Sequence, residues 1–323
     1  MAQGRVSNRA DSTELASRSP FRKYLRAMWM DRWLYVMLLP AILFVVIFNY
    51  VPLYGLTLAF RIYRPSMGPF RSPWAQPIFY NFWFLRDQEF WFVLGNTVRI
   101  SIAKILFGFP APIFLALLIN EVANQAYKRV IQTVTYLPHF ISWVVISGLI
   151  YKFFSVDADS PYNIIRAVFG LSPTNLLTRE SVFLPLVVIS GILKEVGWGT
   201  IIYLAAIMNI DPELYEAAVM DGAGRWRQTR HVTIPGMLPI ITIFMILTMP
   251  GLLSAGFDQI YNLMNPMIAR VANVTDIYVL RVGLLQGQYA YATAIGLVFG
   301  VFSLALLVTA NRIARRSMGY GLW

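Results

Sequence analysis

Few residues in this sequence could perform covalent or metal chemistry. There is no cysteine, so disulfides, thiolate nucleophiles and thiolate metal ligands are excluded. The two histidines, His139 and His231, are far apart in the sequence and form no cluster with metal-ligand spacing. The side chains left for specific chemistry are charged and aromatic groups within apolar stretches. Such groups bind ligands and partners, and the sequence offers no converging set of acids and bases for catalysis.

Lys194 and Glu195 form one such group, because a charge at membrane depth is costly and faces protein or water. Glu195 belongs to a row of residues at four-residue spacing, with Trp198 beside it: Gly191, Glu195, Gly199 and Tyr203. Two interpretations are open. The small residues permit close helix packing, with the charges paired, or they leave room for a sugar above an aromatic ring and a carboxylate. The candidates for solute contact are Lys104, Lys194, Glu195, Trp198 and Tyr203.

A second group lies in the polar segment from Asp211 to Pro235. Asp211 can cap a helix whose first residue is Pro212. Gly222 can adopt the left-handed conformation that closes this helix. A second short stretch then runs to Pro235, which we expect to end it. The segment therefore predicts a helix, a glycine turn and another helix.

One face of the first of these helices carries small residues at helical spacing: Leu214, Ala217, Ala218 and Asp221. Arg225, Arg227 and Arg230 add a basic second half. This suits a helix seated in the groove of a partner protein. A positively charged loop that only follows membrane topology explains the residues equally well.

The elements that carry these groups are long apolar blocks. The chain is 57% hydrophobic and 13% charged, with a mean hydropathy of +0.57, which is too apolar for one soluble core of this size. Six blocks are long enough to cross a membrane as helices, and they span Leu34–Ala59, Phe92–Ile119, Val134–Phe154, Val182–Met208, Met237–Ala255 and Tyr289–Ala310. Because the blocks are apolar on all faces, the sequence predicts an all-α polytopic membrane protein with six transmembrane helices.

Residues 1–33 are polar and basic and are expected to form a cytoplasmic N-terminal tail, with residues 34–323 as the transmembrane domain. The first block is too long for a cleaved signal peptide. The segments on the tail's side of the membrane hold roughly twice as many basic residues as the other side, which predicts that both termini are cytoplasmic. On the outer side, arginines at 61, 64, 71 and 86 could favour an acidic sugar chain or serve a partner protein. The acidic residues of the outer segments nearly cancel the charge of all the outer basic residues together.

The segment from Glu216 to Pro235 resembles the EAA signature of permeases in binding-protein-dependent ABC importers. The matching residues are Glu216-Ala217-Ala218, Gly222, Val232, Ile234 and Pro235. Further motifs resemble the carbohydrate-uptake branch, in particular the subgroup for complex oligosaccharides and polysaccharide fragments that includes the alginate importer. They are Asn96-Thr97, Asn120-Glu121, Tyr136 to Ser142, Tyr203 to Ala206 and Gly256 to Ile260.

The resemblance implies a type I ABC importer-like transmembrane domain whose cytoplasmic coupling helix docks on an ATPase. Carried onto this sequence, the coupling residues are Glu216, Ala217, Ala218, Asp221, Gly222, Ala223, Arg225 and Pro235. The sequence has no Gly-x4-Gly-Lys-Ser/Thr motif, so this chain binds no cofactor itself, and ATP and magnesium belong to a separate ATPase.

The implied partners are two ABC ATPase subunits, a second permease that is a different homologue, an extracytoplasmic sugar-binding protein and the lipid of a bacterial inner membrane, with no nucleic acid. The implied function is import of an oligosaccharide or polysaccharide fragment, such as acidic alginate, by alternating access. The alternatives are an ion-gradient sugar symporter and an ABC permease for non-sugar cargo. A membrane-embedded glycan-processing enzyme would need converging catalytic groups that the sequence lacks.

Overall fold

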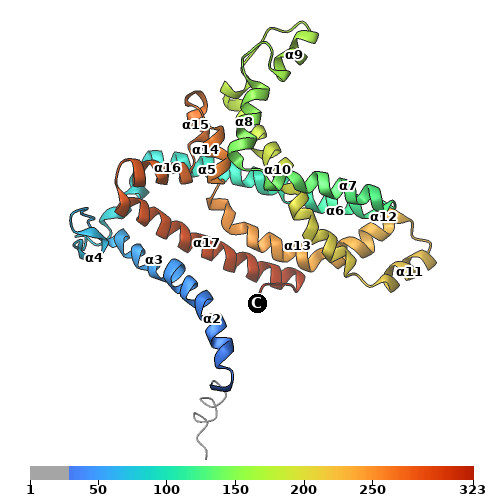
Figure 1. The fold of residues 1–323 in the computed structure, drawn as a ribbon, viewed down its shortest axis with the longest axis horizontal. Coiled ribbons are helices and arrows are strands. Elements are labelled where there is room, and N and C mark those ends of the chain that lie inside the picture. Colours follow the sequence, from blue (N-terminus) through green and yellow to red (C-terminus); the bar gives the residue numbers. More distant parts are fainter. Residues whose placement is uncertain (1–28) are drawn as a thin grey trace, which may run out of the picture. The chain divides into compact units, whose positions relative to one another are not determined.

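The structure, a computed structural model, describes residues 29–323 (Figure 1). Most of the predicted N-terminal tail, residues 1–28, lies outside the described residues. The chain divides into two compact units, of which the first ends at Thr57 and the second spans Leu58–Trp323. Each unit is described by itself.

The first unit is a single apolar helical span. It consists of α2 (Arg32–Val45), a π-helical turn (Val46–Tyr50), α3 (Val51–Leu53) and the start of a 3-10 turn over Tyr54–Phe60, whose last three residues belong to the second unit. The whole stretch, Arg32–Phe60, is long and apolar enough to cross a membrane. None of the side chains of α2 is buried. A helix that is apolar on all faces requires lipid or another apolar surface around it.

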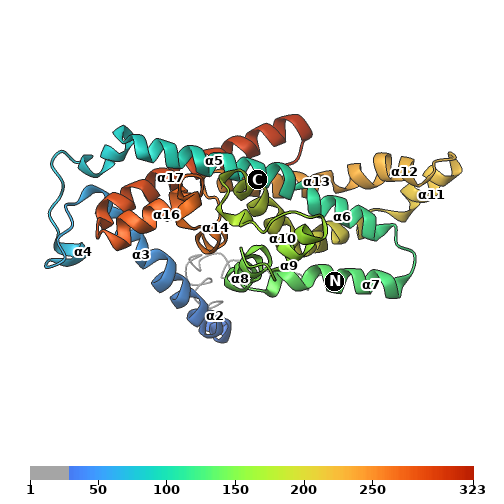
Figure 2. The same ribbon diagram turned by 90° about the horizontal axis from the view of Figure 1, so that it is seen from above.

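The second unit contains the remaining helices of the described chain (Figures 1 and 2). Their bounds are α4 Gly68–Arg71, α5 Gln88–Gly108, α6 Pro110–Asn120, α7 Gln125–Tyr136, α8 Trp143–Phe154, α9 Pro161–Val168, α10 Glu180–Met208, α11 Pro212–Met220, α12 Arg225–Gln228, α13 Ile234–Thr248, α14 Phe257–Leu263, α15 Ala269–Ala272, α16 Thr275–Leu280 and α17 Tyr289–Met318. Pairing between extended segments in the described chain is limited to one isolated bridge, between Arg61 and Trp74. The predicted all-α class is confirmed.

Five spans in the described chain are long and apolar enough to cross a membrane, and there are six if one bent pair counts as a single span. The bent pair is the third predicted block. Instead of one helix over Val134–Phe154, the chain has Gln125–Phe140 and Trp143–Phe154, which are inclined by 99°. Pro138 is the second residue of a 3-10 turn (Leu137–Phe140) at the end of α7, and the Ser142 hydroxyl then caps α8 by accepting a bond from the Val145 amide. Both residues favour a break over a straight helix.

The expected stop at Pro235 is wrong. A helix runs from Arg225 to Leu253 without interruption. It includes a π-helical turn at Thr229–Thr233, and Pro235 falls in the first turn of α13 that follows. The π-helical turn directly before Pro235 provides the local change in hydrogen bonding with which a helix accommodates a proline.

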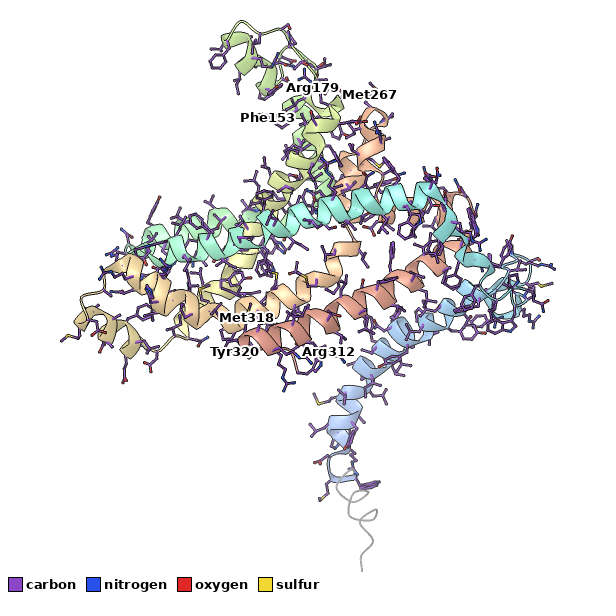
Figure 3. The ribbon with its side chains drawn as sticks, turned by 180° about the vertical axis from the view of Figure 1, so that it is seen from behind. Phe153, Arg179, Met267, Arg312, Met318 and Tyr320 are labelled. Carbon is purple, nitrogen blue, oxygen red and sulfur yellow. The ribbon has the colours of Figure 1, made fainter. Side chains whose placement is uncertain are left out.

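Three clusters of buried apolar side chains hold the second unit together. One lies around Phe84, Phe90 and Ile295. The others comprise Phe183 and Ile260 with their neighbours, and Ala116, Leu204 and Met237 with theirs. Phe153, Arg179 and Met267, which are labelled in Figure 3, mark the end of the unit where α8, α10 and the segment before α15 meet.

Candidate functional site: a lined cavity and an exposed loop

A cavity of about 820 Å³ lies within the second unit. The row predicted on α10 runs along its wall, since Gly191, Glu195, Gly199 and Tyr203 all line it. A volume of this size lies in the range of small-molecule sites. The sequence showed the shared helix face, and the structure adds that this face borders an open space.

The wall of the cavity is mainly apolar, and it includes six aromatic residues and a few polar groups. The aromatic lining residues are Phe109, Trp143, Trp198, Tyr203, Phe244 and Phe257. The charged lining residues are Lys104, Glu195 and Asp258. Apolar rings with a small number of placed polar groups are the usual composition of a ligand site.

Glu195 is held in place at the bend between α7 and α8. The His139 ring nitrogen Nδ1 lies 2.7 Å from Glu195 Oε2. The His139 ring also stacks on Trp198, with centroids 4.5 Å apart and planes inclined by 4°. Glu195 and Trp198 are nevertheless about half exposed, at 49% and 45%. The cavity wall therefore presents a fixed carboxylate beside a fixed indole.

Lys194 does not line the cavity, although the sequence placed it among the solute-contact candidates. It is only 7% exposed, and its ammonium donates to the carbonyl oxygen of His139. The same ammonium lies 3.6 Å from Glu195 Oε1. The physical reason is direction, since neighbouring residues on a helix point about 100° apart. Lys194 therefore fixes the backbone of the bend and forms an ion pair with Glu195 at its edge, which the sequence left open.

Lys104 lines the cavity at the end of a polar seam on α5 (Asn96, Thr97, Ser101 and Lys104). The Lys104 ammonium donates to the carbonyl oxygen of Ala255 at 2.7 Å, and the Ser101 hydroxyl donates to Ser254 at 3.3 Å. These carbonyls belong to the irregular stretch that ends at Gly256, whose φ is +90°. Irregular backbone at membrane depth needs such partners, because lipid offers none.

The other end of the seam holds the segment before α16. The Thr97 and Thr275 hydroxyls are 2.8 Å apart, and the Thr275 amide donates to Thr97 Oγ1. The Asn96 amide donates to the carbonyl oxygens of Arg270 and Asn273. The seam thus ties residues 254–275 to α5.

Asp276 completes this arrangement next to the seam. Its carboxylate accepts a hydrogen bond from the Ser254 hydroxyl at 3.0 Å. Burial raises the pKa of the Asp276 carboxyl, while the bond from Ser254 acts in the opposite direction. Lys104 and Asp276 therefore bracket the backbone break from two sides.

The loop from α11 to α12 is the second candidate site. Asp211 Oδ1 accepts a bond from the Glu213 amide, and α11 begins at Pro212, as predicted. Gly222 has a φ of +74°, in the left-handed region predicted for it. In Figure 1, α11 and α12 form the tip at one end of the second unit. The Tyr215 hydroxyl fixes α11 through a bond of 3.0 Å with Thr233.

The coupling residues named from the sequence fall into two places. Glu216, Ala217 and Ala218 lie on α11, and Asp221 to Arg225 form the turn and the start of α12, all of them exposed or half-buried. Arg225 lies 3.7 Å from the Glu121 carboxylate. Pro235 is not part of this group, since it lies beyond the π-helical turn within the next span.

Sequence reasoning missed two large apolar side chains at the tip. Met220 is 86% exposed and Trp226 is 74% exposed. The signal was available, because a methionine and a tryptophan in a polar, basic loop are unusual for a segment with no partner. His139, the partner of Glu195, was also missed as a site residue. Nothing in the spacing relates His139 to a helix that begins about 40 residues later.

One of the outer arginines, Arg61, is held inside its own loop. Arg61 is buried, and its guanidinium donates to the carbonyl oxygens of Phe70 and Ser72. It also lies over the Trp74 ring, 4.4 Å from its centroid. Arg61 therefore shapes its own loop and is not available to a sugar chain.

Within residues 29–323, no three His, Asp or Glu side chains are placed to hold a metal ion.

Comparison with known proteins gives consistent matches. Residues 108–318 match the family described as "Binding-protein-dependent transport system inner membrane component". Protein LplB of Bacillus subtilis is 39% identical over 300 residues, which cover 93% of this chain and 94% of LplB. The B. subtilis polygalacturonan/rhamnogalacturonan transport system permease protein YteP is 38% identical, over 94% of each chain.

A solved structure is also similar. It is the crystal structure of a bacterial alginate ABC transporter in complex with an alginate pentasaccharide-bound periplasmic protein. One of its chains superposes with a TM-score of 0.83 and is 37% identical. The match covers 92% of this chain and 99% of that chain.

Proposed function

Because the chain belongs to the family of inner membrane components of binding-protein-dependent transport systems, we propose that it is one permease subunit of an ATP-driven oligosaccharide importer. The chain is a multi-pass membrane protein of that family. The cargo, the partners and the coupling residues are the parts that we propose.

The exposed α11–α12 tip is the observation that carries the proposal. It combines a capped helix, a left-handed glycine turn and two large apolar side chains that no other part of the described chain covers. Such a surface is stable only when a partner covers it. The chain has no P-loop motif, so we assign ATP, magnesium and hydrolysis to a separate ATPase that binds at this tip.

The proposed mechanism is alternating access. Two ATPase subunits need two docking tips, and this chain supplies one, so a second permease completes the complex. ATP binding brings the ATPases together, and the docked tips transmit the movement to the two permeases. An extracytoplasmic binding protein delivers the cargo to the other side. The basic α12 and the C-terminal end of α17 then face the cytoplasm, as the positive-inside rule requires.

An oligosaccharide that contains uronic acid residues is the cargo that the relatives favour. YteP is named for polygalacturonan and rhamnogalacturonan, and the similar crystal structure holds alginate pentasaccharide on its periplasmic protein. The aromatic cavity of this chain supports a carbohydrate, because rings of tryptophan and phenylalanine suit the apolar faces of sugars.

The test is ATPase activity of the complex isolated through this chain and reconstituted in lipid. Candidate oligosaccharides are supplied with and without the binding protein. We expect one class of sugar to stimulate hydrolysis, and only when the binding protein presents it. If no ATPase purifies with the chain and uptake needs no nucleotide, the ion-gradient symporter replaces our proposal. Stimulation by a non-sugar cargo alone would instead support the other alternative.

A further inference from the structure

The Glu195 end of the cavity has a charge pattern that restricts which sugar residue can occupy it. The lining holds two carboxylates, Glu195 and Asp258, and a single ammonium, Lys104. That ammonium already donates to Ala255. The ammonium of Lys194 points behind the wall, toward the carbonyl oxygens of Pro138 and His139. Apart from Lys104, the charged groups that line the cavity are therefore carboxylates.

We propose that Glu195 and Trp198 form a subsite for an uncharged sugar residue, and that this subsite rejects a uronate. This inference rests on the proposed function of an oligosaccharide permease. The Glu195 carboxylate accepts hydrogen bonds from the hydroxyls of a neutral sugar residue. The ionised carboxylate of a uronate residue at the same place would be repelled by the negative charge of Glu195. Mixed chains of neutral and acidic residues then enter with a neutral residue at this position.

Neighbouring side chains already hold Glu195 and Trp198 in place. His139 covers one face of the Trp198 ring and orients it, while Trp198 still lines the cavity. The Glu195 carboxylate has about four lone-pair positions. His139 Nδ1 takes one, at 2.7 Å, and Lys194 lies at 3.6 Å from the other oxygen. Acceptor capacity is left toward the cavity.

Gly191 lies against the Gln259 side chain beside the subsite. A Cβ atom added at Gly191 would meet the Gln259 side chain only at 3.6 Å, an ordinary contact. Gly191 precedes Glu195 by one helical turn on the same face. A side chain larger than glycine at this position would therefore contact Gln259 beside the carboxylate.

The test is direct binding to the complex purified through this chain, without the binding protein. Two radiolabelled probes of equal length are compared: a rhamnogalacturonan tetrasaccharide, which alternates neutral and acidic residues, and tetragalacturonate, in which every residue is acidic. We expect the wild-type complex to bind the alternating probe at least tenfold more tightly.

The decisive variant is Glu195→Gln, which keeps the shape and hydrogen bonding but removes the charge. We expect it to reduce the tenfold preference to twofold or less, chiefly because tetragalacturonate binds better. Glu180→Gln makes the same chemical change in the exposed first turn of α10 and should leave the preference unchanged. Trp198→Phe should retain binding of the alternating probe, and Trp198→Ala should weaken it about tenfold.

Glu195 also holds His139, so melting temperatures of all variants accompany the binding data. A wild-type preference for tetragalacturonate, an unchanged preference in Glu195→Gln, or no binding of either probe would overturn the subsite. The proposed function is decided separately, by ATPase stimulation in the presence of the binding protein. A complex that is stimulated by sugar but whose preference ignores Glu195 retains the function and loses the subsite.

Discussion

At Gly197, α10 lies directly against the backbone of α7. A Cβ atom built at this position would lie 2.0 Å from the carbonyl oxygen of Thr135. The obstacle is backbone, which cannot rotate away as a side chain can. The closeness allows Lys194 and Glu195 to reach the bend.

We expect Gly197→Ala to destabilise the protein by about 1–3 kcal/mol, because overpacking forces the two helices apart. Gly148→Ala in α8 is the matched control, since a Cβ atom there meets no atom within 4 Å. The measurement is the melting temperature of the purified complex in detergent. Equal melting temperatures for the two variants would show that α10 does not need this contact.

Gly222 controls the shape of the tip through its positive φ. A β-branched residue in the left-handed region costs about 1–2 kcal/mol, so we expect Gly222→Val to change the angle between α11 and α12. Sugar-stimulated ATPase activity should fall about fivefold or more, with normal amounts of the chain in the membrane. Gly224 has a φ of −70° and open space around it, so Gly224→Ala should behave as wild type. Full stimulation in Gly222→Val would remove the tip from the coupling pathway.

At the scale of elements, α5 acts as the support for irregular backbone through its polar seam. Thr97 is fully buried, and its hydroxyl accepts a bond from the Thr275 amide. Thr97→Val keeps the volume but leaves that amide and the Thr275 hydroxyl without this partner. An unsatisfied buried group costs about 1–3 kcal/mol.

Thermal unfolding measures this effect, and Thr133→Val is the control. The Thr133 hydroxyl is exposed and bonds only within its own helix, so this variant should melt at the wild-type temperature. Thr97→Val should melt several degrees lower. If both variants melt with the wild type, the seam carries no stability.

The elements show which parts of the fold a sequence can reveal. The start of α11 follows from Asp211 and Pro212, because a cap and its helix are neighbours in the chain. The passage of a helix through Pro235 depends on a π-helical turn, which has no residue signature of its own. The 99° bend at Pro138 and Ser142 was also not predicted, because a run of apolar residues has the same pattern whether it is straight or bent.

The candidate site also has one part that the sequence predicts and one part that it does not. The row from Gly191 to Tyr203 is local, so helical spacing placed it on one face. The pairing of His139 with Glu195 joins residues 56 positions apart, and no pattern in one sequence relates them. The contacts of these residues with cargo stay a prediction.

At the scale of the whole molecule, the topology can be tested because the chain has no cysteine. Single cysteines at Met220, Asn124 and Ile164 would lie on α11, on the loop before α7 and on α9. If the bent pair crosses the membrane once, membrane-impermeant thiol reagents should label Ile164→Cys from outside. They should label the other two only after the membrane is opened.

The alternative is that the bent pair is a re-entrant loop, which enters and leaves on one side. Asn124→Cys and Ile164→Cys would then be labelled from the same side. That result would reduce the six predicted spans to five and place the termini on opposite sides of the membrane.

The polar seam on α5 also bears on how the chain is made. Lys104 and its partner Ala255 are 151 residues apart, which corresponds to roughly 8–30 s of translation at about 5–20 residues per second. We expect α5 to be in the bilayer during this interval, with its polar face formed. The broken backbone from Ser254 to Thr275 leaves the ribosome later and meets hydrogen-bond partners in place of hydrocarbon. The order of synthesis therefore provides the support before the segment that depends on it.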